Sequence, residues 1–249
     1  MKNSLILKMM FLMLLALASR VQAQTTYRIE QIGPDPNPPE VYFYFVNDLN
    51  DKGEVIGGAY AGTSPFWSWL WRDGEFIRLP GLPGAVEPAY VYANGMNDRT
   101  QIVGDGGTAD PAITRAFIWQ NGKTRELQPL ASMGASPVDL NNLGMILGAK
   151  AVDGATVSFV QWGRHSLQLE SLPGSNYTYA TRINERGMVI GNATTDSFTR
   201  TRAVIWKFGK IRDIGVLPGG YDSRANGLND RGEVAVQVRV GPEGESARA

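Results

Sequence analysis

Three tyrosines, one aspartate and one arginine are the residues of this sequence best suited to contact a ligand. They are Tyr90, Tyr177, Tyr221, Asp222 and Arg224. A tyrosine ring offers apolar surface beside a hydroxyl, and the polar neighbours add hydrogen-bonding groups, a combination that suits sugars and protein surfaces. We therefore predict that these residues form a binding surface for a protein or a carbohydrate. The alternative is that they only cover the edges of a sheet, because tyrosine is common near the start of any strand.

The composition removes several kinds of catalytic and metal site. The chain of 249 residues has no cysteine and one histidine, His165. Thiol catalysis, cysteine-ligated zinc and iron–sulfur clusters are thereby excluded, as is any site that needs two histidines. The 24 basic and 24 acidic residues balance, so the chain has no net positive charge that would attract nucleic acid. We expect no metal, no cofactor and no nucleic-acid partner.

Paired carboxylates are the catalytic chemistry that the composition leaves open. Glycoside cleavage depends on the separation of two carboxylates in space, which the sequence spacing does not give. A polysaccharide hydrolase or lyase is therefore the alternative to a non-catalytic binding module, with Asp105 and Asp222 as the first carboxylates to test. The acidic residues near the expected loops are Glu87, Asp105, Asp110, Asp153, Asp196 and Asp222.

A repeat organises the chain. An apolar residue, an asparagine, two variable residues and usually a glycine recur five times, at steps of 47, 44, 43 and 45 residues. The asparagines are Asn50, Asn97, Asn141, Asn184 and Asn229. Tryptophans that end an apolar strand keep the same step, and we expect them to pack between sheets; they are Trp71, Trp119, Trp162 and Trp206. A glycine follows each of the first four asparagines by seven residues, at Gly57, Gly104, Gly148 and Gly191.

The turns between the predicted strands can be assigned from the same pattern. Asparagine at the first and glycine at the fourth position predict a type I turn closed by a left-handed residue, and the segments after the tryptophans fit the same pattern. Thr100 replaces this glycine in the second repeat, and a β-branched residue resists the left-handed conformation. We therefore expect Thr100→Gly to stabilise the protein by about 1 kcal/mol.

His165 argues against a Ser-His-Asp catalytic site. Counted from Trp162, it holds the place of Gly74, Gly122 and Gly209 in the other repeats. We expect it in a tight turn with a positive φ, which histidine tolerates better than most residues.

Four short strands per repeat, arranged radially, predict an all-β fold, a β-propeller of about five four-stranded blades with one incomplete. The incomplete blade can be closed within the chain, or a shortened ring can be completed by self-association with another copy. A β-solenoid is the alternative fold, although its coils are usually shorter than 40 residues.

Strands that alternate in direction place their connections at two ends. The tight-turn end carries the turns after the repeat asparagines and tryptophans. The long-loop end carries the Leu-Pro-Gly connections and the variable segments 59–65, 105–114 and 192–201. Variable loops on a rigid frame are the usual place for binding, so we assign the predicted ligand surface to the long-loop end and His165 to the other.

The N-terminal residues predict export. Residues 1–23 combine a basic start, an apolar run of ten residues and the small-residue spacing Val21-Gln22-Ala23 of a signal-peptidase site. Ten apolar residues fall short of the roughly 20 that span a bilayer. We predict a signal peptide cleaved after Ala23, a single propeller domain over 24–240, a flexible tail over 241–249, and a secreted or periplasmic product without a membrane span.

Several segments resemble the HAF repeat family of extracellular repeat proteins, which is named for a His-Ala-Phe start to one strand. They are Arg115–Trp119, Arg202–Trp206, Asp213–Gly220 and Leu228–Val234. The resemblance covers nearly the whole chain after residue 23, implies an exported repeat protein, and brings no catalytic residues. Arg115 and Arg202 stand where the family has its histidine, so the resemblance implies no metal site.

Overall fold

A computed structural model describes residues 32, 43–60, 66–110, 112–175, 177–195, 200–241 and 246–248. The predicted signal peptide, residues 1–23, lies outside the described residues. The described chain is all-β except for the short helix α2 (Leu130–Met133), which replaces the Leu-Pro-Gly connection in the second repeat. The helical pattern was not foreseen because four residues are too few to show a helical period.

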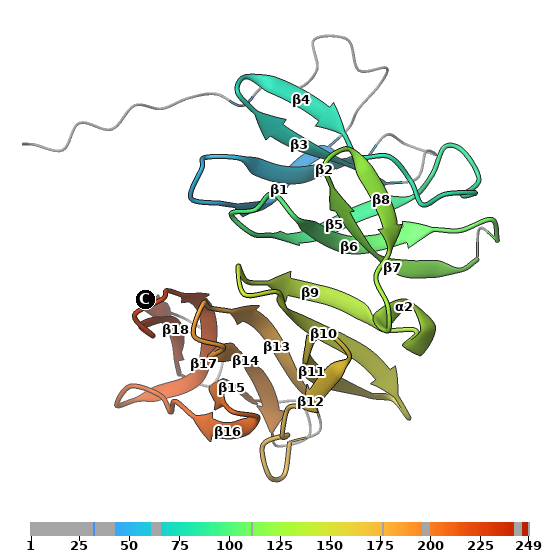
Figure 1. Ribbon diagram of the computed structural model, residues 1–249. Coiled ribbons are helices and arrows are strands. Elements are labelled where there is room, and N and C mark those ends of the chain that lie inside the picture. Colours follow the sequence, from blue (N-terminus) through green and yellow to red (C-terminus); the bar gives the residue numbers. More distant parts are fainter. Residues whose placement is uncertain are drawn as a thin grey trace, which may run out of the picture. The chain divides into compact units, whose positions relative to one another are not determined.

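Each of the first four repeats forms one four-stranded antiparallel sheet, as Figure 1 shows. The first sheet is β1 (Phe43–Leu49), β2 (Val55–Tyr60), β3 (Trp67–Arg72) and β4 (Glu75–Arg78). The second is β5 (Val91–Met96), β6 (Ile102–Gly107), β7 (Thr114–Gln120) and β8 (Lys123–Glu126). The third is β9 (Ser136–Leu140), β10 (Met145–Val152), β11 (Ala155–Trp162) and β12 (His165–Gln168). The fourth is β13 (Tyr177–Ile183), β14 (Val189–Thr195), β15 (Arg200–Lys207) and β16 (Lys210–Asp213).

The fifth sheet has three strands, in the order β17 (Gly220–Leu228), β18 (Val234–Val240) and β19 (Ser246–Arg248). The last of these lies within residues 241–249, for which we predicted a flexible tail, and it pairs antiparallel with β18.

The sheets pack one against the next as the blades of a β-propeller, which confirms the predicted fold. The first strand of each sheet after the first lies against three strands of the sheet before it. The hydrophobic cores lie between successive sheets, because both faces of each inner sheet are apolar. Between the first two sheets the core contains Ile56, Leu70, Met96, Phe117 and Trp119.

One face of the first sheet has no sheet packed on it within the described residues. Ala93 and Met96 of β5 are 0% and 5% exposed against the first sheet, whereas Val46 and Leu49, at the same repeat positions in β1, are 62% and 61% exposed. The cores that the described residues form therefore do not extend across this face.

All five asparagine turns have the predicted geometry. The residue at the fourth position has a positive φ in each, including Thr100 at 56°. The structure also explains the asparagine: in the fourth repeat, Asn184 Oδ1 accepts hydrogen bonds from the backbone N–H groups of Arg186, at 3.0 Å, and Met188, at 2.9 Å. The side chain therefore stabilises the turn that it begins.

The same asparagines connect neighbouring sheets. The Nδ2 group of each of the first four donates to the backbone carbonyl of the next repeat's asparagine, at 3.2, 3.2, 2.9 and 3.0 Å along the chain. Asn229 comes last, and its Nδ2 donates instead to Glu233 of its own turn. A ladder of side-chain hydrogen bonds therefore runs along the tight-turn end.

The glycine seven residues after each of the first four repeat asparagines lies very close to a backbone carbonyl or an aromatic ring of the neighbouring strands. A Cβ atom on Gly191 would lie 2.1 Å from the carbonyl oxygen of Tyr179 and 2.9 Å from the Trp206 ring. A Cβ atom on Gly57 or Gly104 would likewise meet a backbone carbonyl oxygen and an aromatic ring of its own sheet. Only glycine fits at this position.

Trp162 is not the repeat tryptophan, although the sequence pattern predicted that it is. Phe159 pairs with Gly148 as Phe117 pairs with Gly104, which makes Gln161 the equivalent of the buried Trp119. Side chains alternate along a strand, so a shift of one residue turns Trp162 to the opposite face. Trp162 is 41% exposed, whereas Trp119 and Trp206 are buried as predicted.

The same shift corrects the prediction for His165. The loop consists of Gly163, at φ 58°, and Arg164, and His165 begins β12 in register with Trp162. His165 lies at the tight-turn end as expected, but the positive φ belongs to Gly163.

The other tryptophan turns are two-residue loops in which both residues are left-handed, rather than type I turns closed by glycine. Their first residues are Asp73, Asn121 and Phe208, at φ 53°, 52° and 52°. These dihedrals fit type I′ loops, whose twist matches that of the flanking strands.

Candidate functional site

The structure places the five predicted site residues at the long-loop ends of three sheets. Tyr90 precedes β5, Tyr177 begins β13, and the other three lie in β17. Tyr90, Tyr177 and Tyr221 are each half-buried. They form ring contacts with different neighbours and not, within the described residues, with one another. The predicted residues therefore belong to separate parts of this end.

Asp222 is buried, and both of its carboxylate oxygens have a partner. One carboxylate oxygen accepts the backbone N–H of Thr201 at 3.0 Å, and the other pairs with the guanidinium of Arg239. The Arg239 and Arg200 guanidinium carbons lie 5.1 and 4.8 Å from the centre of the Tyr221 ring. This end of β17 is therefore a cation–π and ion-pair cluster, and Arg224 lies exposed two residues beyond it.

A group of half-exposed aromatic rings joins the first two sheets at the long-loop end, and we call it the aromatic patch: Phe45, Tyr60, Phe66, Tyr90 and Tyr92. The Phe66 ring centre lies 5.0 Å from that of Tyr60, 6.2 Å from that of Phe45 and 6.3 Å from that of Tyr90. Phe45 stacks on Tyr92 at 5.7 Å. These rings form one connected apolar surface that carries three hydroxyl groups.

The strand geometry positions this patch. Phe45 in β1 pairs with Gly58 in β2, where a Cβ atom would lie 2.5 Å from the Phe45 ring. The glycine gives the ring room to lie across the sheet toward Tyr92 of the next blade. Tyr60 ends β2, and Phe66 precedes β3. Tyr90 was predicted from the sequence, but its partners come from a different repeat and only the packing of the sheets reveals them.

Asp105 lies beside the aromatic patch. It pairs across the sheet with Tyr92, and burial raises the pKa of its carboxyl to about 6, although hydrogen bonds from Ser136 and Asn94 act to lower it. The pKa of Tyr90 is also raised, first by burial and then by the negative charge of Asp105. The patch therefore has one carboxyl group that is partly protonated near neutral pH.

Two further carboxylates with raised pKa values were missed in the sequence. Asp48 and Asp139 stand two residues before a repeat asparagine, and the Asp-Leu-Asn triplet at both places was the available signal. Each accepts backbone N–H groups from its own strand and from the next sheet; for Asp139 the second donor is Ile183, at 2.9 Å. Burial raises the pKa of Asp139 to about 7. Both carboxyls therefore connect neighbouring blades.

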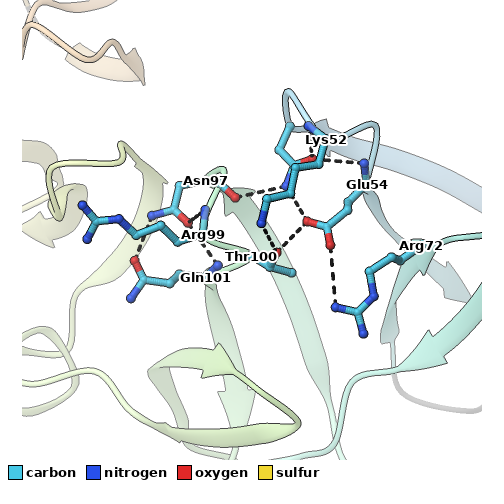
Figure 2. Close-up of polar contacts among 8 residues, drawn as sticks. Lys52, Glu54, Arg72, Asn97, Arg99, Thr100 and Gln101 are labelled. Carbon is cyan, nitrogen blue, oxygen red and sulfur yellow. Dashed lines mark hydrogen bonds and ion pairs between the residues drawn. The ribbon is translucent and has the colours of Figure 1, made fainter.

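Another buried carboxylate lies at the tight-turn end, between the first two sheets (Figure 2). Glu54 is 4% exposed and accepts hydrogen bonds at 2.6 Å from Thr100 Oγ1 and from Asn50 Nδ2. Arg72 Nη1 lies 3.7 Å from its other oxygen, and Lys52 Nζ donates to Thr100 Oγ1 at 3.5 Å. The Glu54 carboxylate is therefore a structural group with its partners satisfied.

The described residues offer no group of three or more His, Asp or Glu side chains that could hold a metal ion. His165 is exposed, and its ring stacks on Trp162 with the centres 6.0 Å apart. In the part of the chain that the structure describes, no helix is long and apolar enough to cross a membrane.

The solved structures that are similar to this chain include two from Pyrococcus species. The β-propeller domain of the Trilobed protease from Pyrococcus furiosus, whose topology is described as an open velcro, is 11% identical with a TM-score of 0.51, over 70% of this chain and 55% of that chain. Pyrococcus horikoshii acylaminoacyl peptidase is 14% identical with a TM-score of 0.48, over 80% of this chain and 33% of that chain. This chain thus spans about half of the first protein and a third of the second. No family model and no curated protein matches the sequence.

Proposed function

We propose that this β-propeller is a non-catalytic binding module that takes a carbohydrate ligand on the aromatic patch. The connected set of half-exposed rings is the observation that carries the proposal. None of these five residues belongs to the buried core cluster between the first two sheets, and contiguous exposed apolar surface often marks a binding site. Sugar rings present flat apolar faces edged by hydroxyls, which match aromatic rings flanked by Tyr60, Tyr90 and Tyr92 hydroxyl groups.

Export and membership of the HAF repeat family are parts of the same proposal. A binding module for extracellular glycans requires passage across the membrane, and the N-terminal residues have the pattern of a cleaved signal. N-terminal sequencing of the protein recovered outside the cytoplasm tests this, with Gln24 as the expected first residue.

The rival function is a polysaccharide hydrolase or lyase that uses Asp105. Its pKa of about 6 suits a general acid. One observation favours binding instead: its carboxylate already accepts a hydrogen bond from Asn94 Nδ2 at 3.3 Å. Cleavage by the usual mechanism needs a pair of carboxylates.

A glycan array with the purified protein tests the proposal. Tyr60→Ala and Tyr90→Ala should each weaken binding at least about fivefold, because an aromatic anchor typically contributes 1 kcal/mol or more. Leu143→Ser is the matched control, since Leu143 is 64% exposed in a tight turn at the opposite end. Binding that survives both tyrosine substitutions contradicts the assignment. Release of reducing ends from a glycan, lost in Asp105→Asn, would favour the hydrolase. A pull-down that captures a protein, with no glycan bound on the array, would change the ligand class to a protein.

A further inference from the structure

A concave site lies at the tight-turn end, where the third and fourth sheets meet. It is a depression of about 200 Å³ whose apolar lining includes Met145, Trp162, Leu167, Trp206 and Phe208. This volume is below the about 300–1,000 Å³ of sites that enclose a whole small molecule. It is the size of a pocket for one large side chain of a partner.

The repeat is irregular at this place. Trp162 faces the depression because it lies one residue out of phase, so an indole that the second and fourth repeats bury is 41% exposed here. At the positions that Glu54 and Thr100 hold between the first two sheets, the third and fourth sheets have Met145 and Gly187, and Met188 and Gly232 form the same pair between the fourth and fifth, so the irregular residue at this place is Trp162. Departures from a repeat concentrate at functional sites.

Phe208 is the most exposed of the large apolar residues described, at 91%. It occupies the first position of a left-handed two-residue loop at φ 52°, where Asp73 and Asn121 provide the residue types that tolerate such a φ. The Phe208 side chain therefore strains its loop and contributes no burial to the fold. Its loop is nevertheless held firmly, since the Gly209 carbonyl accepts the backbone N–H of Glu170 at 3.0 Å.

Positive charge borders the apolar depression. Phe208, Arg186 and Gly187 also line an adjoining depression of about 250 Å³, together with Lys207 and Arg231. Arg231 pairs with Glu233 at 2.7 Å, whereas Arg186 and Lys207 form no ion pair with the residues that the structure describes. Two exposed cations beside an apolar pocket complement a negatively charged group close to a large apolar one.

We propose that these two depressions bind an acidic peptide segment of a partner protein, with one large apolar side chain in the pocket lined by Trp162 and Phe208 and with carboxylates against Arg186 and Lys207. This site lies at the end of the sheets opposite the aromatic patch, and its occupant is a protein rather than a glycan. It is therefore independent of the proposed carbohydrate binding.

The test is selection of random seven-residue peptides on the purified protein, with counter-selection on Phe208→Asn. Asparagine suits the left-handed loop position, as Asn121 does, so this variant keeps the fold while it removes the aromatic ring. Enriched peptides should carry one large apolar residue flanked by Asp or Glu. Fluorescence anisotropy with one such peptide should show at least tenfold weaker binding to Phe208→Asn and several-fold weaker binding to Lys207→Gln, with Val86→Ala, 53% exposed at the other end, unchanged.

Several results would overturn the proposal. Peptides that are basic or that bind Phe208→Asn equally well would show that neither the charge nor the pocket selects the ligand. Binding of decanoate, with no peptide enriched, would assign the site to a small amphiphile. A dimer in solution that Phe208→Asn dissociates would assign it to a second copy of the chain.

Discussion

Thr100→Gly is the substitution for which the structure reverses the expectation from the sequence. Thr100 has a φ of 56°, and relief of this left-handed conformation favours glycine by about 1–2 kcal/mol. Against this, the hydroxyl donates at 2.6 Å to a buried carboxylate oxygen of Glu54. A hydrogen bond to a charged group contributes about 1.5–3 kcal/mol, and glycine adds an entropic cost of about 0.5–1 kcal/mol. The net effect is a destabilisation of about 1–2 kcal/mol.

A double-mutant cycle separates the two contributions. At the positions of Glu54 and Thr100, the third and fourth repeats place Met145 and Gly187, so Glu54→Met with Thr100→Gly reproduces a pair that the protein already uses. Each single substitution should lower the free energy of unfolding, because each removes one hydrogen bond from a buried polar group that remains. The double variant should recover most of that loss.

The assay is urea denaturation of the purified protein, followed by tryptophan fluorescence, with the free energies compared across the four variants. Thr100→Ser serves as the control, since it keeps the hydroxyl and should lie close to the wild type. A higher unfolding free energy for Thr100→Gly, or single effects that simply add in the double variant, would refute the reasoning.

Other expectations concern the pH, the repeated glycine and the asparagine ladder. The folded state raises the pKa of Asp139 to about 7, so the protonated carboxyl stabilises the folded state. This stabilisation is fully present below pH about 4, the ordinary pKa of an aspartate, and is lost as the pH rises through 7. The melting temperature should therefore fall between pH 5 and pH 8, and it should fall less in Asp139→Asn. Gly191→Ala should destabilise by about 3 kcal/mol, measured by urea denaturation, while Gly227→Ala, whose Cβ would meet only Ala235 at 3.5 Å, is tolerated. Asn184→Ala should cost about 2–3 kcal/mol, because it removes two bonds in its turn and one to the next repeat. Asn229→Ala should cost less, and equal losses would contradict a role between sheets.

The sheets and asparagine turns could be predicted because their determinants are local. Asparagine and glycine fix a turn through hydrogen bonds and dihedral angles within five residues, as the turn at Asn184 illustrates. The repeat multiplied this weak signal fivefold. The propeller followed from the number of strands in each repeat.

The phase of the third sheet could not be predicted from tryptophan spacing. Trp162 lies one residue after the position of the buried tryptophans in the other sheets, which Gln161 holds here. Side chains alternate along a strand, so this shift of one residue places the Trp162 side chain on the opposite face of the sheet. Aligning Phe159 with Phe117 would have found the correct phase, because both lie over the repeated glycine.

The candidate sites depend on contacts between repeats. Tyr90 could be proposed from its type and position, but its contact with Phe66 joins residues on either side of an entire β-hairpin. Asp222 looked available for ligand binding, whereas its partners Thr201 and Arg239 come from other strands. Spacing in the sequence carries no information on either arrangement.

The placement of the carbohydrate site is tested most directly by hydrogen–deuterium exchange on the protein with and without a glycan that it binds. Binding at the aromatic patch predicts slower exchange of the backbone amides in residues 58–60, 66–68 and 89–93. Protection confined to residues 162–169 and 186–209, or no bound glycan to map, would contradict the account.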